Sequence, residues 1–167
     1  MTARCWVFDE TIDTDVLAPG QYIKQPIEIL AAHCLESVRG DFAGTVTAGD
    51  VIVAGRNFGV GSSREQAAQA LKVLGVAGIV AESFGGIFFR NAINIGLPVM
   101  TPVEPGQLLS LFSDGDQVEL DVFGARLEKP AQQIEVYLQP MPEFLANLIK
   151  AGGLVNVLRE RFQASAE

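Results

Sequence analysis

Short apolar runs alternate with longer polar-and-apolar stretches through the first hundred residues. The apolar runs are residues 4–8, 51–54, 78–81 and 98–100. Each has the length of a buried strand and is bounded by polar or glycine-containing segments. Helices are expected over residues 66–72, which are good helix formers, and over residues 84–95, ending near Gly75 and Gly96. Strand–helix–strand order with short links predicts an α/β fold, with a mostly parallel sheet flanked by helices.

The remaining stretches predict smaller units around this sheet. Strands of a small antiparallel extension are expected at residues 116–122, 124–129 and 134–138. Amphipathic helices are expected at residues 142–150 and 154–162, on either side of Gly152-Gly153, and a further helix at residues 27–36. Apolar stripes on the last two helices are interpreted as core packing, with a partner surface as the alternative.

Composition narrows the class of protein. The chain has 167 residues, of which 49% are hydrophobic and 19% charged, so we expect one well-packed domain over residues 1–167. The net charge of −8, with no run of basic residues, argues against a nucleic-acid partner. No stretch has the length of a membrane span or a signal peptide. Cys5 and Cys34 are interpreted as free thiols of a cytosolic protein, and with His33 they form no recognisable metal site.

The most informative stretch is Gly55–Glu65, with the sequence Gly-Arg-Asn-Phe-Gly-Val-Gly-Ser-Ser-Arg-Glu. It lies between an expected strand and an expected helix. Its glycines permit a tight turn, and the helix that follows presents free N–H groups and a positive dipole end. Ser62, Ser63 and Arg64 add two hydroxyls and a guanidinium fork, so the stretch predicts a site for a carboxylate or phosphate.

Two other interpretations of this stretch are open. A capping box, with Ser62 as N-cap and Glu65 at N3, explains those two residues but not Arg64. A dinucleotide fingerprint would start at Gly59-Val60-Gly61 and take Glu82 as the ribose-binding acid. Arg64 stands where that fingerprint requires a third small residue, which weakens the match, and the P-loop pattern fails because no lysine precedes Ser62.

Three segments resemble the small subunits of aconitase-like hydro-lyases, above all those of bacterial and archaeal 3-isopropylmalate dehydratases. Asp13–Pro19 is similar to the family's Asp-Thr-Asp-x-Ile-x-Pro opening. Gly55–Glu65 matches the family's glycine–serine–arginine signature almost residue for residue, and Ser83–Ala92 resembles its Ser-Phe-x-x-Ile-Phe segment. Together the three segments extend over most of residues 9–100.

The resemblance implies a swivelling β/β/α domain that is half of an enzyme. In this family a separate large subunit holds a [4Fe–4S] cluster, which acts as a Lewis acid on the substrate's hydroxyl and carboxylate. The implied activity is dehydration and rehydration of a substituted malate, as in the isomerisation of 3-isopropylmalate in leucine biosynthesis. We expect a cytoplasmic heterodimer that binds a di- or tricarboxylate substrate.

By position in the motifs, the resemblance implies roles for five residues. Ser62 would be the base, acting as an alkoxide, and Asp15 would be the family's active-site aspartate. From the residues alone, Asp9–Asp15 is explained either as an acidic turn with helix caps or as a turn that holds a carboxylate near the Arg64 loop. Ser63 and Arg64 would bind a substrate carboxylate. Lys24 lies in the segment that would read the substrate's variable group, so homoaconitate-type and dimethylmalate-type substrates stay open beside isopropylmalate. A dinucleotide-binding module and a non-catalytic regulatory domain are the alternatives from other classes.

Overall fold

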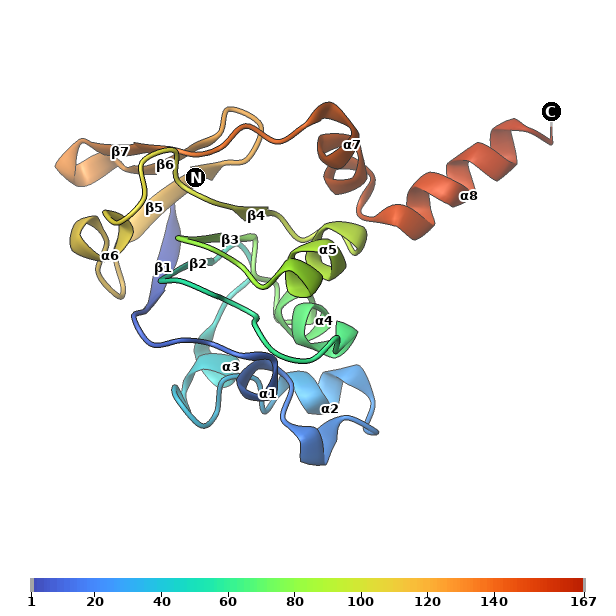
Figure 1. Cartoon of the computed structure of the whole chain (residues 1–167), viewed down its shortest axis with the longest axis horizontal. Helices are drawn as coiled ribbons and strands as arrows, with labels where there is room; N and C mark the ends of the chain where they lie inside the picture. Colours follow the sequence, from blue (N-terminus) through green and yellow to red (C-terminus); the bar gives the residue numbers. More distant parts are fainter. Residues whose placement is uncertain (1, 167) are drawn as a thin grey trace.

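The computed structural model describes residues 2–166. Its strands are β1 (Ala3–Phe8), β2 (Val51–Ala54), β3 (Gly78–Ala81), β4 (Val99–Met100), β5 (Gln117–Asp121), β6 (Arg126–Lys129) and β7 (Ile134–Tyr137). They form a seven-stranded sheet in the order β4-β3-β2-β1-β5-β6-β7. Strands β1 to β4 pair in parallel, and β5 to β7 continue the sheet antiparallel from β1 (Figure 1). The predicted α/β class, with its antiparallel extension, is confirmed.

Helices connect the parallel strands and follow the antiparallel ones. They are α1 (Thr14–Leu17), η1 (Gly20–Tyr22), α2 (Ile27–Ala31), α3 (Phe42–Thr45), α4 (Glu65–Val73), α5 (Gly86–Asn94), α6 (Leu108–Leu111), η2 (Pro130–Gln132), α7 (Glu143–Ala151) and α8 (Leu154–Ala164). The helix expected over residues 27–36 is wrong in length, because α2 ends at Ala31 and turns follow. Leu35 adopts a left-handed φ of 62° there, which redirects its N–H to the carbonyl of Val16.

Alternation along the parallel strands divides the core between the two faces of the sheet. Trp6 and Phe8 point to the face covered by α2, α4 and α5, where the larger cluster of buried residues lies. Cys5 and Val53 point to the opposite face, where they pack with α6 and the antiparallel strands. The molecule therefore has three layers, antiparallel strands on parallel strands on helices (Figure 1).

The sheet curls until its two outer strands meet. Just beyond β4 and β7, Pro102 and Leu138 form an isolated antiparallel bridge. On either side of it, the N–H of Val103 donates to the carbonyl of Tyr137 at 2.9 Å and that of Gln139 to Thr101 at 2.8 Å. The smaller core is enclosed by this curled sheet and α6.

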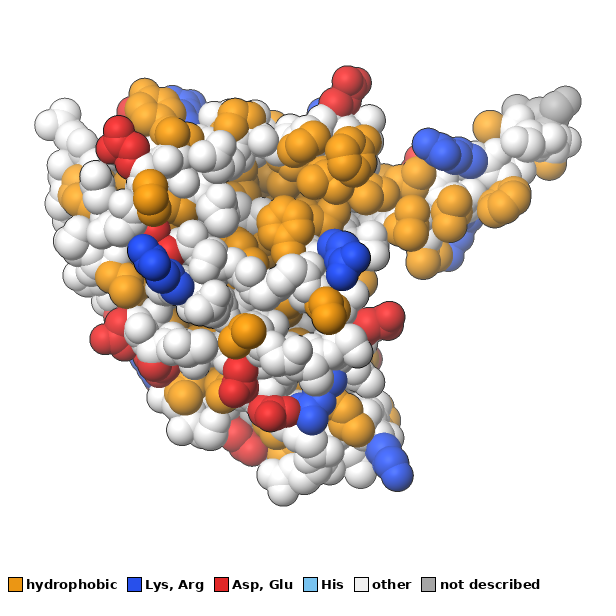
Figure 2. Space-filling view, viewed as in Figure 1, with side chains coloured by type: hydrophobic (Ala, Val, Ile, Leu, Met, Phe, Trp, Pro, Cys, Tyr) orange, Lys and Arg blue, Asp and Glu red, His pale blue; other side chains and the backbone are white. Residues whose placement is uncertain are grey.

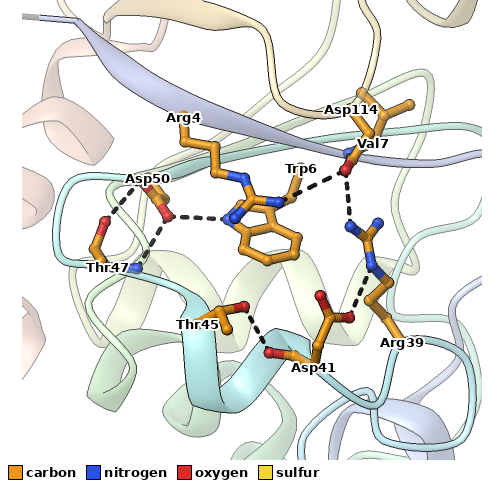
Figure 3. A network of polar contacts seen from close by, with 9 residues as sticks. All are labelled: Arg4, Trp6, Val7, Arg39, Asp41, Thr45, Thr47, Asp50 and Asp114. Carbon is orange, nitrogen blue, oxygen red and sulfur yellow. Dashed lines mark hydrogen bonds and ion pairs between the residues drawn. The ribbon is translucent and has the colours of Figure 1, made fainter.

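A polar network surrounds Trp6 and ties the connection between α2 and β2 to the sheet (Figure 3). The guanidinium of Arg4 lies 3.7 Å from the centre of the indole and that of Arg39 lies 4.9 Å from it. The indole N–H donates to the buried Asp50 carboxylate at 2.9 Å, and Arg39 donates to Asp114 at 2.8 Å. These contacts hold the connection between α2 and β2 against β1.

Helix α8 projects from the body, and apolar side chains lie along it (Figures 1 and 2). Leu158 is 42% exposed and Phe162 is 73% exposed, so the predicted core packing is wrong for the stripe on α8. It is confirmed for α7, whose Leu145, Leu148 and Ile149 pack against the larger core. None of the described helices combines the length and apolarity needed to cross a membrane.

Candidate active site

The candidate site is the loop between β2 and α4, at the carboxyl end of the parallel strands. Backbone hydrogen bonds hold this loop on two sides. On one side, Gly59 N–H donates to the carbonyl of Ile12 at 2.7 Å, and Thr14 N–H donates to the carbonyl of Val60 at 2.9 Å. On the other side, a bridge joins Phe58 to Phe84. The structure therefore brings together all three segments that carry the family resemblance.

Two glycines in the loop are required by its packing. Gly59 has φ +75°, and a Cβ there would lie 2.2 Å from the ring of Phe88. Gly61 has φ +123°, and a Cβ there would lie 2.8 Å from the hydroxyl oxygen of Thr14. Both positions combine a left-handed backbone with contact to a neighbouring side chain, so any other residue would displace the loop.

Ser62 lies at the exposed end of this loop and contacts a buried threonine. The two hydroxyl oxygens, Ser62 Oγ and Thr14 Oγ1, are 3.0 Å apart. Thr14 Oγ1 also accepts the backbone N–H of Ser62 at 3.0 Å, and Thr14 is only 2% exposed. If Ser62 lost its proton, its oxygen could only accept, so the Thr14 hydroxyl would become a donor to it. This contact fixes both the backbone and the side chain of Ser62.

Arg64 links the loop to the segment after β1. Its Nη1 donates to the carboxylate of Asp15 and, at 3.1 Å, to the carbonyl of Ala18. Asp13 caps α1 by accepting the N–H of Val16 at 2.9 Å. The acidic turn thus contains both a helix cap and a carboxylate held against Arg64, the two interpretations that its sequence allowed.

The capping-box interpretation of Ser62 and Glu65 is wrong. Helix α4 begins at Glu65, its N-cap residue is Arg64, and Arg64 makes no side-chain capping hydrogen bond. Ser62 is instead held by Thr14, 48 residues away in sequence, in a contact that local spacing does not reveal. The start of α4 is left with N–H groups and a positive dipole end beside Ser62 and Ser63.

The two other predicted site residues are exposed. Ser63 follows Ser62 and its carbonyl lies 3.5 Å from the side-chain nitrogen of Asn91 in α5. Lys24 comes two residues after η1, in the segment that begins at the Ala18 carbonyl bound by Arg64. Sequence reasoning misses Thr14; its place between Asp13 and Asp15 in the motif is the only signal, because its burial is seen only in the structure.

Glu82 has a structural task that differs from the ribose-binding role. Its two carboxylate oxygens accept the N–H of Gly106 at 2.7 Å and the N–H of Leu108 at 3.1 Å. These bonds hold the start of α6 against the end of β3. The interpretation of Gly59-Val60-Gly61 and Glu82 as a dinucleotide site therefore loses its acidic residue.

The residues that the structure describes do not fit an iron–sulfur cluster. Such clusters are held by several cysteine thiolates. Cys5 and Cys34 are buried in different cores, on opposite faces of the sheet. Burial raises the pKa of the Cys5 thiol to about 12, with Asp116 adding to the shift, and burial alone raises the pKa of Cys34. Within residues 2–166, no group of three or more histidine, cysteine or acidic side chains is placed to hold a metal ion.

The match to known proteins agrees with this geometry. Residues 44–104 match the model of the aconitase C-terminal domain. The chain is 45% identical over 159 residues to 3-isopropylmalate dehydratase small subunit 1 of Thermotoga maritima, covering 94% of this chain and 93% of the relative. It is 45% identical over 155 residues to the methanogen homoaconitase small subunit of Methanothermobacter thermautotrophicus, covering 92% and 87%.

A solved structure shows the same fold. The crystal structure of 3-isopropylmalate dehydratase from Methanocaldococcus jannaschii superposes with a TM-score of 0.88 at 36% identity, over 99% of this chain and 96% of that one. The fold and the serine–arginine loop thus define an aconitase-type C-terminal domain. The chain belongs to the family of aconitase-like dehydratase small subunits.

Proposed function

We propose that this chain is the small subunit of a hydro-lyase that isomerises 3-isopropylmalate and 2-isopropylmalate by dehydration and rehydration, in leucine biosynthesis. The observation that carries the proposal is the Ser62–Thr14 contact beside Arg64, in a chain with near full-length similarity to such subunits. We further propose that residues 1–167 act as one swivelling domain in the cytoplasm, paired with a large subunit as a heterodimer.

The [4Fe–4S] cluster belongs, in this proposal, to the large subunit. The two buried cysteines of this chain, on opposite faces of the sheet, support that assignment. The isolated chain is then expected to be colourless and inactive, and to become active when reconstituted with a cluster-loaded large subunit. Absorption spectra and an assay of the purified chain, alone and after reconstitution, test this. A brown, active preparation of the single polypeptide would overturn it.

Ser62 is proposed as the base that takes a proton from the carbon next to a substrate carboxylate. A serine hydroxyl is a poor base unless its alkoxide is stabilised. Three features of the loop favour the alkoxide: the hydroxyl of Thr14 at 3.0 Å, the positive end of α4, and Arg64 two residues later. The proton that leaves the carbon is then held on Ser62 Oγ until it is returned or lost.

Arg64 and Ser63 are proposed to bind the substrate carboxylate, the arginine through its fork and the serine through its N–H. In this structure Arg64 Nη1 is engaged by Asp15 and Ala18. Asp15 is 70% exposed, so its carboxylate can exchange with that of an incoming substrate. We propose that Asp15 orients Arg64 before binding and takes part in the active site after it.

The choice of substrate is proposed to depend on the segment around Lys24. Ile23 is partly buried beside it and suits an alkyl group, whereas Lys24 is exposed and suits a distal carboxylate. The equal identity to a homoaconitase small subunit is the observation that favours the second candidate, a homoaconitase-type enzyme. A dimethylmalate-type substrate is the smaller alkyl variant of the first.

Lys24→Ala separates the candidates. In the reconstituted complex, we expect kcat/KM for 3-isopropylmalate to stay within about twofold of wild type, because an exposed lysine has no partner on an alkyl group. A tricarboxylate that relied on Lys24 would instead lose about a hundredfold, because its distal charge would be left unpaired. Two results together would favour the homoaconitase-type function. The wild-type complex would have little activity on isopropylmalate, and Lys24→Ala would selectively lose kcat/KM for the tricarboxylate.

A further inference from the structure

The segment that carries Lys24 is part of a long excursion from the sheet, here defined as residues 18–34. The excursion is closed at its base, where the N–H of Leu35 donates to the carbonyl of Val16 at 3.0 Å. Its first residue is fixed to the site loop through the bond from Arg64 to Ala18. Between these ends, Gly20–Gln25 forms one limb and α2 with its following turns forms the other.

One aromatic pair joins the two limbs. The rings of Tyr22 and His33 lie parallel, with centroids 3.7 Å apart and planes 7° from each other. Tyr22 is two residues before Lys24, and its carbonyl accepts the N–H of Gln25 at 2.9 Å. The position of the Tyr22 ring therefore sets the position of the short turn on which Lys24 stands.

The imidazole is itself held in place. His33 Nδ1 lies 2.6 Å from a carboxylate oxygen of Glu36, and because a carboxylate only accepts, Nδ1 is the donor. The backbone at His33 is also fixed. The N–H of His33 donates to the carbonyl of Leu30 at 3.0 Å, and the left-handed turn at Leu35 follows two residues later. The backbone at the base of the excursion thus fixes where the ring stands, and the bond to Glu36 only orients the ring on which Tyr22 stacks.

We propose that His33 is a positioning residue for substrate selection: by stacking on Tyr22, it holds the Gly20–Gln25 limb in the conformation that presents Ile23 and Lys24 to the substrate. This inference rests on the proposed function, because it assigns His33 a part in substrate binding. It gives His33 no contact with the substrate and no part in proton transfer at Ser62.

The first experiment needs no activity. Trypsin cleavage after Lys24, followed by mass spectrometry of the 1–24 fragment from the intact isolated chain, reports how often the limb opens. His33→Ala should speed this cleavage about fivefold, since an aromatic pair of this kind is lost. His33→Phe keeps a stacking ring and should stay within about twofold of wild type, because an ion pair as exposed as His33–Glu36 contributes little. Ile29→Ala, an exposed apolar truncation in α2, is the matched control and should change nothing.

The second experiment measures substrate binding in the complex with the large subunit. His33→Ala should raise KM about fivefold and leave kcat within about twofold, and His33→Phe should restore KM. Tyr22→Ala should have the same effect, and the double variant should add little to either single change, because both remove one contact.

The outcomes separate this inference from the proposed function. Unchanged cleavage in His33→Ala, or faster cleavage with an unchanged KM, would overturn the role of His33. A wild-type complex inactive on every malate derivative tried would instead contradict the proposed function. In that case cleavage after Lys24 still decides whether His33 holds the limb.

Discussion

The site loop and the excursion over residues 18–34 lie side by side but are held in different ways. The loop is fixed by backbone hydrogen bonds to neighbouring segments and by two glycines that admit no side chain. The Gly20–Gln25 limb is held by local turns, by a half-buried ring pair and by partial burial of Tyr22 and Ile23 against the core, and Arg64 bonds Ala18 just before it. A reacting group must be placed within a fraction of an ångström, whereas a segment that contacts the substrate's variable group needs less precise placement. If the proposed roles hold, chemistry and substrate selection are carried by separate parts of this chain.

The largest effect is expected from removing the proposed base. Ser62→Ala should lower kcat of the reconstituted complex by about 10⁴-fold, since general-base catalysis is lost while the fold is kept. Ser63→Ala is the matched control, because the binding role proposed for Ser63 uses its N–H, and it should lose less than about tenfold. Steady-state kinetics and size-exclusion chromatography of both variants check this. Equal losses in the two variants would mean that the hydroxyl of Ser62 has no special role.

A second change tests the rigidity of the loop directly. Gly59→Ala forces a Cβ to within 2.2 Å of Phe88 at a positive φ, so we expect a loss of about 3 kcal/mol in the free energy of unfolding. Gly86→Ala, at a glycine whose added Cβ would meet nothing within 4 Å, should be neutral within about 0.5 kcal/mol. Urea unfolding of the isolated chain measures both. If Gly59→Ala lowered the free energy of unfolding by less than about 1 kcal/mol, the loop would be more adaptable than its packing suggests.

The third change removes the hydroxyl behind Ser62. Thr14→Val keeps the shape but leaves Ser62 without its side-chain partner and without the acceptor for its N–H, so kcat should fall about a hundredfold. Thr14→Ser retains the oxygen and should recover most of that loss. The ratio of the two kcat values isolates the hydroxyl from the packing of the buried side chain. If kcat of the Thr14→Ser variant were as low as that of Thr14→Val, the loss would be due to the missing methyl group and not to the hydroxyl.

The smallest effect in this series is expected at the junction between the two regions. Arg64→Lys should raise KM about tenfold, because a point charge cannot bridge Asp15, Ala18 and a substrate carboxylate as a planar fork does. Arg56→Lys, at an exposed arginine of the same loop, serves as the control and should leave KM unchanged. Substrate saturation curves for the two variants decide the matter, and similar KM values would remove the proposed clamp.

The sequence was sufficient wherever structure depends on local pattern. The apolar runs at residues 51–54 and 78–81 are strands with the predicted bounds, and the turn glycines Gly75 and Gly96 both have positive φ. The motif predicts a site loop at Gly55–Glu65, and the two other motif segments, Asp13–Pro19 and Ser83–Ala92, contact that loop. Patterns of three to eleven residues carry this information because the interactions behind them are short in sequence.

What depends on distant contacts was not predictable from those patterns. The capping-box alternative fails because the serine that resembles a cap is engaged by Thr14, while α4 begins at Glu65, within one residue of the expected start. The helix at α2 was made too long because Leu35 turns back to bond Val16, a tertiary demand that overrides helix propensity. The rings of Tyr22 and His33 stack although the residues are eleven apart in sequence and lie on different limbs of the excursion. No local sequence pattern predicts this contact.

The meeting of β4 and β7 through Pro102 and Leu138 has a consequence for the life of the chain before assembly. Before it meets a partner, a subunit already exposes its serine–arginine loop to solvent. Exposed strand edges, with unpaired backbone N–H and C=O groups, would add a risk of aggregation. Free strand edges recruit strands from other molecules and begin aggregation. Because the segments just beyond β4 and β7 pair side by side, with a proline at the junction, the curled sheet covers part of the two outer edges on which such pairing could start.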